Sequence, residues 1–158
     1  MKTSTGIELE IQYAVSGEGL PARSDFREWV EAALAGRRDR AALVIRIVDE
    51  HESAGLNQRY RHKAGPTNVL SFPFRAPPPV ETDLLGDLAI CAPLVRRQAG
   101  AQGKTERAHW AHMVVHGVLH LLGYDHEDSA RAAEMERIEA GILARLGFPD
   151  PYQQHGAS

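Results

Sequence analysis

The pattern of apolar and polar residues along this chain predicts four strands. Residues 7–13, Ile-Glu-Leu-Glu-Ile-Gln-Tyr, alternate with the period of two that is typical of a half-buried strand. Residues 42–48 form a nearly continuous apolar run and are the strongest strand candidate. Two further strands are expected at residues 67–74 and 84–91, and Pro73 marks either the end of the first of these or an edge position in the sheet.

Apolar residues at helical spacing predict the remaining elements. Phe26, Trp29 and Val30 are spaced so that they share one face of a helix. We expect helices at about residues 26–34, 53–60, 93–102, 106–122 and 128–146. Because strands crowd the first 91 residues and helices the rest, we expect an α+β fold with a single four-stranded mixed sheet packed with about five helices.

Length and composition indicate one globular domain over residues 1–158, with about 149–158 as a flexible tail. Cys91 is the single cysteine, so no intrachain disulfide is possible and a reducing compartment is the simpler interpretation. The longest apolar stretch, residues 113–122, is far shorter than the ~20 residues that span a bilayer. We therefore expect a cytoplasmic protein that has no membrane partner.

The overall charge limits the kinds of nucleic-acid binding that are open to the chain. It has 18 Lys and Arg against 21 Asp and Glu, which gives −3 with neutral histidines. Proteins that coat nucleic acid without sequence preference carry a basic excess, because neutralised phosphates supply most of their affinity. Any nucleic acid that this chain handles must therefore meet a local basic cleft.

Histidines are concentrated in the second half of the chain. Five of the eight lie in an 18-residue window, at His109, His112, His116, His120 and His126. The first four are separated by three, four and four residues, so on a helix they share one face. This long helix in the C-terminal half is therefore the expected carrier of a metal site.

His116, His120 and His126 are the predicted metal ligands. His116 and His120 are one helical turn apart, and Gly123 can end the helix and reverse the chain so that His126 returns toward them. Three imidazoles and an open fourth position are typical of a catalytic zinc, so we expect one Zn²⁺ ion, although nickel, copper or iron would also suit three histidines.

Some alternatives for these histidines stay open. A bare pair four residues apart can be two hydrogen-bonded core histidines. His109 and His112 are expected to be packing residues, hydrogen-bond partners of the ligands, or residues on the substrate side. A hidden fourth protein ligand, His109, His112 or Asp125, would close the site.

The histidine spacing is also that of the metzincin proteases, H-E-x-x-H-x-x-G-x-x-H. Those proteases use the glutamate as a general base, but this chain has Gly117 at that position. Glycine cannot transfer a proton, so peptide hydrolysis loses its usual base.

A short basic segment precedes the third predicted strand. Arg59, Arg61, His62 and Lys63 make half of the residues from 56 to 63 potentially cationic. Guanidinium groups bind phosphate oxygens in bidentate geometry, so an arginine here could hold a phosphodiester near the metal. The alternative is a solvated helix end whose cations complement the helix dipole.

Together these motifs resemble the bacterial YbeY family of rRNA-maturation endoribonucleases. The resemblance is carried by residues 57–73, with Pro-Thr-Asn-Val-Leu-Ser-Phe-Pro, by Leu-Gly-Asp at 85–87, and by residues 109–126, and it covers roughly 42–152. It implies a zinc-dependent, single-strand-specific endoribonuclease acting in 16S rRNA 3′-end maturation and ribosome quality control.

The resemblance also implies roles for particular residues and partners. His116, His120 and His126 match the metal ligands of the family, and Arg61 matches its functionally important arginine, while Arg59 and Lys63 are expected to contact RNA. The expected partners are rRNA and ribosomal particles, with ribosomal proteins or assembly GTPases as further candidates and no DNA. The implied fold is a four-stranded sheet with the metal helix packed beneath it.

Two other functions compete with this one. The first is a metallohydrolase of peptides or small molecules. The second is a non-catalytic ribosome-assembly protein that zinc stabilises, with Arg59, Arg61 and Lys63 gripping RNA. If the chain is a nuclease, attack by water and attack by the ribose 2′-OH both remain open.

Two aspartates have no settled role. Asp125 would either orient an imidazole or cap the helix that begins near residue 128. Asp87, next to Gly86 on an expected edge strand, is expected to be structural, with substrate contact as the alternative.

Overall fold

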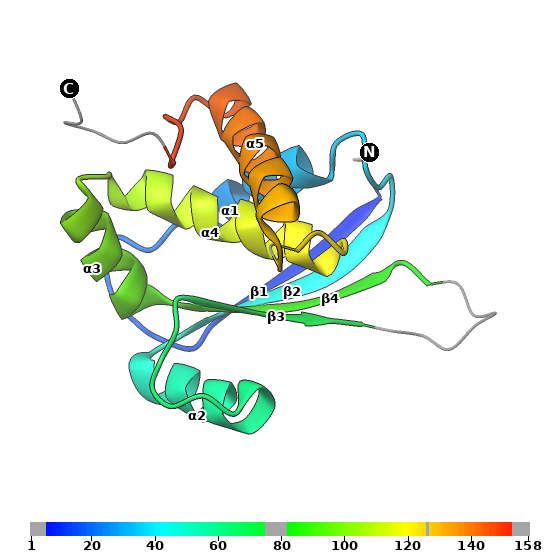
Figure 1. The fold of residues 1–158 in the computed structure, drawn as a ribbon. Helices are drawn as coiled ribbons and strands as arrows, with labels where there is room; N and C mark the ends of the chain where they lie inside the picture. The colour runs from blue at the N-terminus through cyan, green and yellow to red at the C-terminus, as the bar shows by residue number, and fades with distance from the viewer. Residues whose placement is uncertain (1–5, 75–81, 126, 153–158) are drawn as a thin grey trace.

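A computed structural model describes residues 6–74, 82–125 and 127–152, which form four strands and five helices (Figure 1). The elements are β1 (Ile7–Tyr13), α1 (Arg23–Leu34), β2 (Ala41–Val48), α2 (Glu50–Arg61), β3 (Val69–Pro73), β4 (Leu84–Cys91), α3 (Ala92–Gln102), α4 (Glu106–Leu121) and α5 (Ser129–Arg145). The predicted α+β fold is confirmed. No helix in the described part of the chain is both long and apolar enough to cross a membrane.

The sheet has the order β1-β2-β4-β3, in which β1, β2 and β4 are parallel and β3 is antiparallel to β4. The expected edge position of Asp87 is wrong, because β4 is an interior strand and Asp87 lies between Val44 and Phe72. The longer, apolar β4 occupies the interior, whereas the short β3, which ends at Pro73, occupies the edge, where a residue without an N–H is tolerated.

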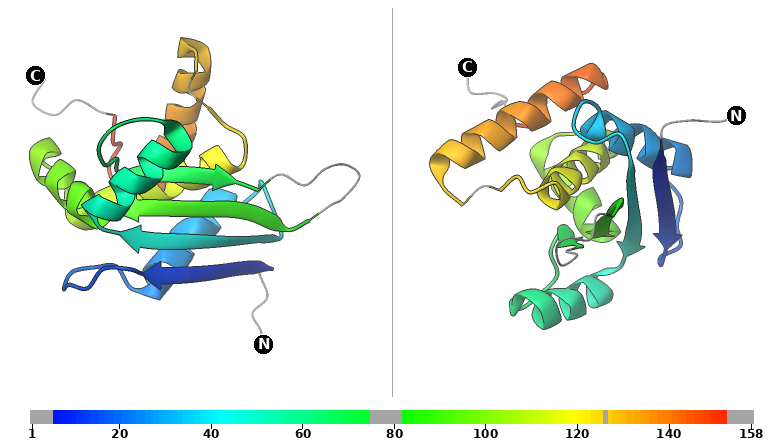
Figure 2. Two further views of the ribbon diagram at one scale, coloured as in Figure 1. Left: turned by 90° about the horizontal axis from the view of Figure 1, so that it is seen from below. Right: turned by 90° about the vertical axis from the view of Figure 1, so that its right-hand side faces the viewer.

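The two faces of the sheet carry different layers (Figures 1 and 2). Helices α1 and α4 cover one face with α5 packed outside α4, and α2 lies on the other face. The alternation along β4 reflects this: Leu88 and Ile90 enter the large core, whereas Ala89 and Cys91 enter a small cluster that Leu56 of α2 covers.

Helix α4 lies almost directly on the sheet. It begins at a Thr105 cap, and twelve of its residues are buried. At Gly117 the helix approaches β4 so closely that a Cβ atom would lie 2.7 Å from Cδ2 of the buried Leu88. The glycine that replaces the metzincin glutamate is therefore required by packing, since not even a methyl group fits without displacing Leu88.

Two other glycines have backbone roles. Gly123 has φ of 104° directly after α4, which confirms that it ends the helix with a left-handed residue. Gly86 has φ of 145°, and a side chain there would overlap the Phe72 carbonyl oxygen. It follows an irregularity in the pairing of β2 with β4, at Ala42 and Leu43. The glycine of the Leu-Gly-Asp stretch is thus required by the strand geometry.

Candidate metal centre

Four histidines line one face of α4, as the spacing predicted. The ring centroids are 6.0 Å apart for His109 and His112, 6.2 Å for His112 and His116, and 4.6 Å for His116 and His120. His109 and His112 are buried, whereas His116 and His120 are partly exposed. The row therefore runs from the interior toward solvent along the helix.

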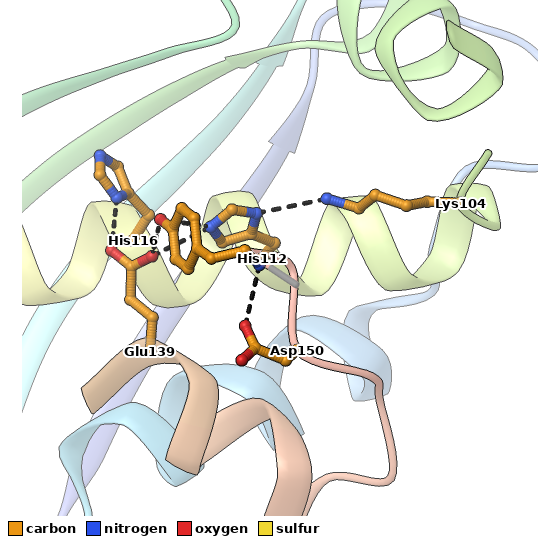
Figure 3. Close-up of polar contacts among 6 residues, drawn as sticks. Lys104, His112, His116, Glu139 and Asp150 are labelled. Atoms are coloured by element: carbon orange, nitrogen blue, oxygen red, sulfur yellow. Dashed lines mark hydrogen bonds and ion pairs between the residues drawn. The ribbon is translucent and has the colours of Figure 1, made fainter. Parts of the chain in front are cut away.

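A glutamate from α5 joins two of these histidines (Figure 3). Glu139 has no exposed surface. One of its oxygens lies 2.6 Å from Nδ1 of His116, and the other lies 3.0 Å from Nε2 of His112. Helix α5 brings this carboxylate to α4 because Met135, Ile142 and Leu143, on the same face as Glu139, are buried in the core.

Two further polar residues complete the network. The Tyr152 hydroxyl donates a hydrogen bond to Glu139 and lies 3.0 Å from Nε2 of His112. On the other side of the ring, Nζ of Lys104 is 3.5 Å from Nδ1 of His112. Tyr152 falls in the predicted tail, but it is held against the cluster; residues 153–158 lie outside the described part of the chain.

The electrostatics of the cluster favour an ionised Glu139 beside a neutral His112 and a neutral Tyr152. Burial opposes the charge of Glu139, but hydrogen bonds from His112, His116 and Tyr152 outweigh it and lower the pKa of the carboxyl to about 2. Burial lowers the pKa of His112, and burial with adjacent Glu139 raises the pKa of Tyr152. Glu139 is therefore an acceptor at neutral pH, and Tyr152 is a donor.

His109 lies at the inner end of the row. Its Nε2 is 2.8 Å from Oε1 of Gln98, which also accepts a hydrogen bond from Asn68 at 3.1 Å. Burial, with Lys104 and His112 nearby, lowers the pKa of His109 to about 3. His109 is thus a buried, neutral packing histidine, one of the roles expected for it.

The described residues include a set of donors that could hold a metal ion. Ligand atoms of His112, His116 and Glu139 all lie within 4.8 Å of one another. Of the predicted ligands, His116 and His120 are neighbours one turn apart on α4, and His126 lies outside the described residues. The ligand assignment to His116, His120 and His126 therefore stays a prediction.

The structure does not bring the basic segment to the histidines. Arg59 and Arg61 lie on the last turn of α2, Lys63 follows that helix, and all three are exposed. Helix α2 and helix α4 lie on opposite faces of the sheet (Figure 1). The end of α2 touches the edge strand through Tyr60, whose ring centroid is 5.3 Å from that of Phe72 in β3.

The structure gives Asp125 an ion-pair contact and places Asp87 inside the sheet. Asp128 caps α5 by accepting the Arg131 N–H at 2.8 Å, and Asp125 pairs with the Arg131 side chain at 3.2 Å. Asp125 therefore secures the start of α5 without being its cap. Asp87 is partly desolvated and near Glu10, and both effects raise the pKa of its carboxyl.

Glu139, Tyr152 and Lys104 were not singled out from the sequence. One signal was present for Glu139, because it falls four residues after Met135 and three before Ile142, on the apolar stripe of its helix. A charged residue on such a stripe needs a buried partner. Tyr152 carries no comparable signal, since its position depends on how the chain turns back after α5.

Comparisons with known proteins place the chain among close relatives. A family model described as Endoribonuclease YbeY matches residues 15–147. An Endoribonuclease YbeY of Nitrosococcus oceani is 54% identical over 149 residues, covering 93% of this chain and 97% of the relative. Another, of Alkalilimnicola ehrlichii, is 57% identical over 152 residues, covering 93% and 92%.

The chain is also similar to a solved structure. The solution structure of a Thermotoga maritima protein superimposes with a TM-score of 0.59 at 23% identity, covering 96% of this chain and 99% of that one. At that level of identity the likeness bears on the fold alone.

Proposed function

The chain belongs to the YbeY family of endoribonucleases, and from this premise we propose that it is a zinc-dependent, single-strand-specific endoribonuclease acting in 16S rRNA 3′-end maturation and ribosome quality control. Its curated relatives are named endoribonucleases, so the reaction is cleavage of RNA phosphodiester bonds. The proposed partners are rRNA and ribosomal particles, and the proposed location is the cytoplasm.

The histidine row on α4 is the structural observation that carries the proposal. We assign the metal to His116, His120 and His126. The donor set fits zinc, because His116 and His120 are adjacent on one helix face and His116 is anchored through Nδ1 to a buried carboxylate, the usual support of a metal-binding imidazole. A bound zinc ion would act as a Lewis acid and lower the pKa of a coordinated water to about 7.

The chain's own residues prepare this site. Glu139 and Tyr152 fix His116 from the side of α5, so the imidazole does not need to be ordered when substrate arrives. The packing of Gly117 on Leu88 leaves no room for a glutamate base at position 117. This supports a nuclease over a metzincin-type peptidase.

Charge pairing supports RNA contacts by the end of α2. Seven described arginines form ion pairs with carboxylates: Arg27, Arg40, Arg46, Arg96, Arg97, Arg107 and Arg131. Arg59, Arg61 and Lys63 belong, with Arg23, Arg37, Arg38, Arg137 and Arg145, to the cations that have no ion-pair partner among the described residues. Such cations can neutralise phosphates without first breaking an ion pair.

We propose that Arg61 holds the RNA phosphodiester and that Arg59 and Lys63 bind neighbouring phosphates. Helix α4 packs on β3 from one side, and Tyr60, next to Arg61, contacts β3 from the other. A single strand that crosses the β3 edge could therefore connect the two sides of the sheet on which the arginine and the histidine row lie. A duplex is too stiff to follow such a path, which agrees with single-strand specificity.

The test is RNA cleavage on a denaturing gel. The substrate is a transcript that covers the 3′ end of small-subunit rRNA, and wild type is compared with Arg61→Ala and His116→Ala purified in parallel. Cleavage by wild type that both variants lose supports the proposal. Equal cleavage in all three lanes would indicate contaminating ribonuclease and contradict it, and a 2′,3′-cyclic phosphate on the product would exclude direct attack by water.

A further inference from the structure

We propose that Glu139 and Tyr152 are positioning residues that hold His116 as its Nδ1–H tautomer, so that its Nε2 carries the lone pair for the metal. The inference rests on the metal site proposed above. It makes a glutamate of α5 and a tyrosine of the C-terminal segment parts of the metal centre, although neither binds the ion.

The hydrogen-bond distances fix where the protons lie. The 2.6 Å separation of His116 Nδ1 from Glu139 is that of a short, charge-assisted hydrogen bond and requires a proton between the two atoms. An ionised carboxylate only accepts, so the proton is on Nδ1. When the His116 imidazole is neutral it carries one N–H, so its Nε2 then bears the lone pair, and Figure 3 shows that this nitrogen is directed away from Glu139.

The same reasoning about proton positions makes His112 a hydrogen-bond donor to Glu139 and not a metal ligand. Its Nε2 is 3.0 Å from Glu139 and must donate to it. The remaining lone pair, on Nδ1, faces the Lys104 amine at 3.5 Å. A cation bound there would be adjacent to a lysine, whereas the outward side of His116 has His120 as its neighbour. The metal therefore belongs on the His120 side of His116.

Tyr152 donates a third hydrogen bond to Glu139. The oxygen that accepts from His112 also accepts from the Tyr152 hydroxyl, so this carboxylate is held by three donors. Tyr152 is itself placed by the turn before it, since its backbone N–H donates to Asp150 at 2.8 Å (Figure 3). The turn at the end of α5 thus holds the carboxylate that orients His116.

The tautomer can be measured without metal or RNA. Long-range ¹H–¹⁵N correlation spectra of metal-free, full-length protein, recorded above the ordinary histidine pKa, distinguish protonated from unprotonated ring nitrogens. The His116 signals are assigned by their loss in His116→Asn. We expect Nδ1 of His116 to be protonated in wild type and in Glu136→Gln, an exposed control on the same helix.

In Glu139→Gln, we expect a mixture of His116 tautomers, because the two histidines contact different oxygens of Glu139 and a glutamine replaces one of these oxygens with an NH2 group that only donates. Zinc affinity, measured by competition with a chromogenic chelator, should fall about 10–100-fold in Glu139→Gln. It should fall less than about tenfold in Tyr152→Phe, which loses one hydrogen bond, and it should not change in Glu136→Gln.

A protonated Nε2 on His116 in the wild-type spectrum would overturn the proposal, and so would a zinc affinity of both Glu139→Gln and Tyr152→Phe equal to that of Glu136→Gln. If Glu139→Gln does not fold, the wild-type spectrum and Tyr152→Phe still decide. A failure of the nuclease assignment would appear in the RNA assay instead. Failure of the metal site itself would appear as full zinc occupancy in His116→Ala.

Discussion

The polar side chains on the two faces of the sheet differ in burial. On the α4 face, His112 and Glu139 are buried and bonded to each other. On the α2 face, Arg59 and Arg61 are exposed at a helix end. Burial of His112 and Glu139 costs desolvation free energy, but it fixes the orientation of both side chains. The exposed arginines stay hydrated and can bind a polyanion.

This difference in burial fits the proposed roles of the two faces, metal binding at α4 and RNA binding at the end of α2. Buried, hydrogen-bonded groups keep their geometry and are weakly screened by salt, as a metal centre requires. Exposed cations are screened at physiological ionic strength and act by attracting phosphates. Substitutions on the α4 face should therefore affect metal binding and folding, whereas substitutions at the end of α2 should affect RNA cleavage alone.

The largest effect is expected from His116→Ala. Loss of a metal ligand should lower zinc affinity by more than about a hundredfold, beyond the loss expected from a supporting residue, and should abolish cleavage. His51→Ala, which removes an exposed histidine of α2, is the matched control and should bind zinc as wild type does. Zinc content after dialysis is the measurement, and full occupancy in His116→Ala would refute the ligand assignment.

Arg61→Ala tests the opposite face. We expect cleavage to fall about a hundredfold, the loss typical of one oriented donor at a transition state, while zinc content and unfolding temperature stay unchanged. Arg40→Ala is the control, since Arg40 is also exposed but already pairs with Asp83. Equal cleavage by wild type and Arg61→Ala would leave Arg61 as a surface residue with no part in the reaction.

Gly117→Ala tests how tightly α4 is pressed on the sheet. The added methyl group would meet Leu88, so we expect a loss of about 1–3 kcal/mol in the free energy of unfolding. Gly100→Ala, in α3, is a helical glycine with open space around it and should gain up to about 1 kcal/mol. Denaturant unfolding measures both, and a stabilising Gly117→Ala would contradict the close approach.

The prediction whose effect is smallest within one pH unit concerns the pH dependence of folding. The pKa of His109 is lowered to about 3, so between that value and its ordinary pKa the unfolded chain binds more protons. The free energy of unfolding that the buried, neutral His109 contributes is therefore lost as pH falls below about 6.5, by about 1 kcal/mol per pH unit. Unfolding of metal-free protein should show a weaker pH dependence in His109→Gln than in wild type; an equal dependence would rule out this contribution.

Much of the fold could be predicted because its signals are local. Apolar alternation located β1, a nearly continuous apolar run located β2, and helical spacing placed the four histidines on one face of α4. The glycine after α4 has the positive φ that its position indicated. These features depend on residues within a turn or a strand of one another.

The parts that could not be predicted depend on packing between distant segments. Glu139 reaches His116 across 23 positions and Tyr152 reaches His112 across 40, through the packing of α5 on α4 and the turn after it. The interior position of β4 depends on which strands pair. The space at Gly117 depends on Leu88 of another strand.

The most direct test of the account is the position of zinc in a crystal of the zinc-loaded protein, located by anomalous scattering at the zinc absorption edge. The account predicts one peak about 2.0–2.1 Å from Nε2 of His116, with His120 and His126 as the other protein ligands and Glu139 on the opposite side of the His116 ring. A peak held by His112, His116 and Glu139 would contradict it.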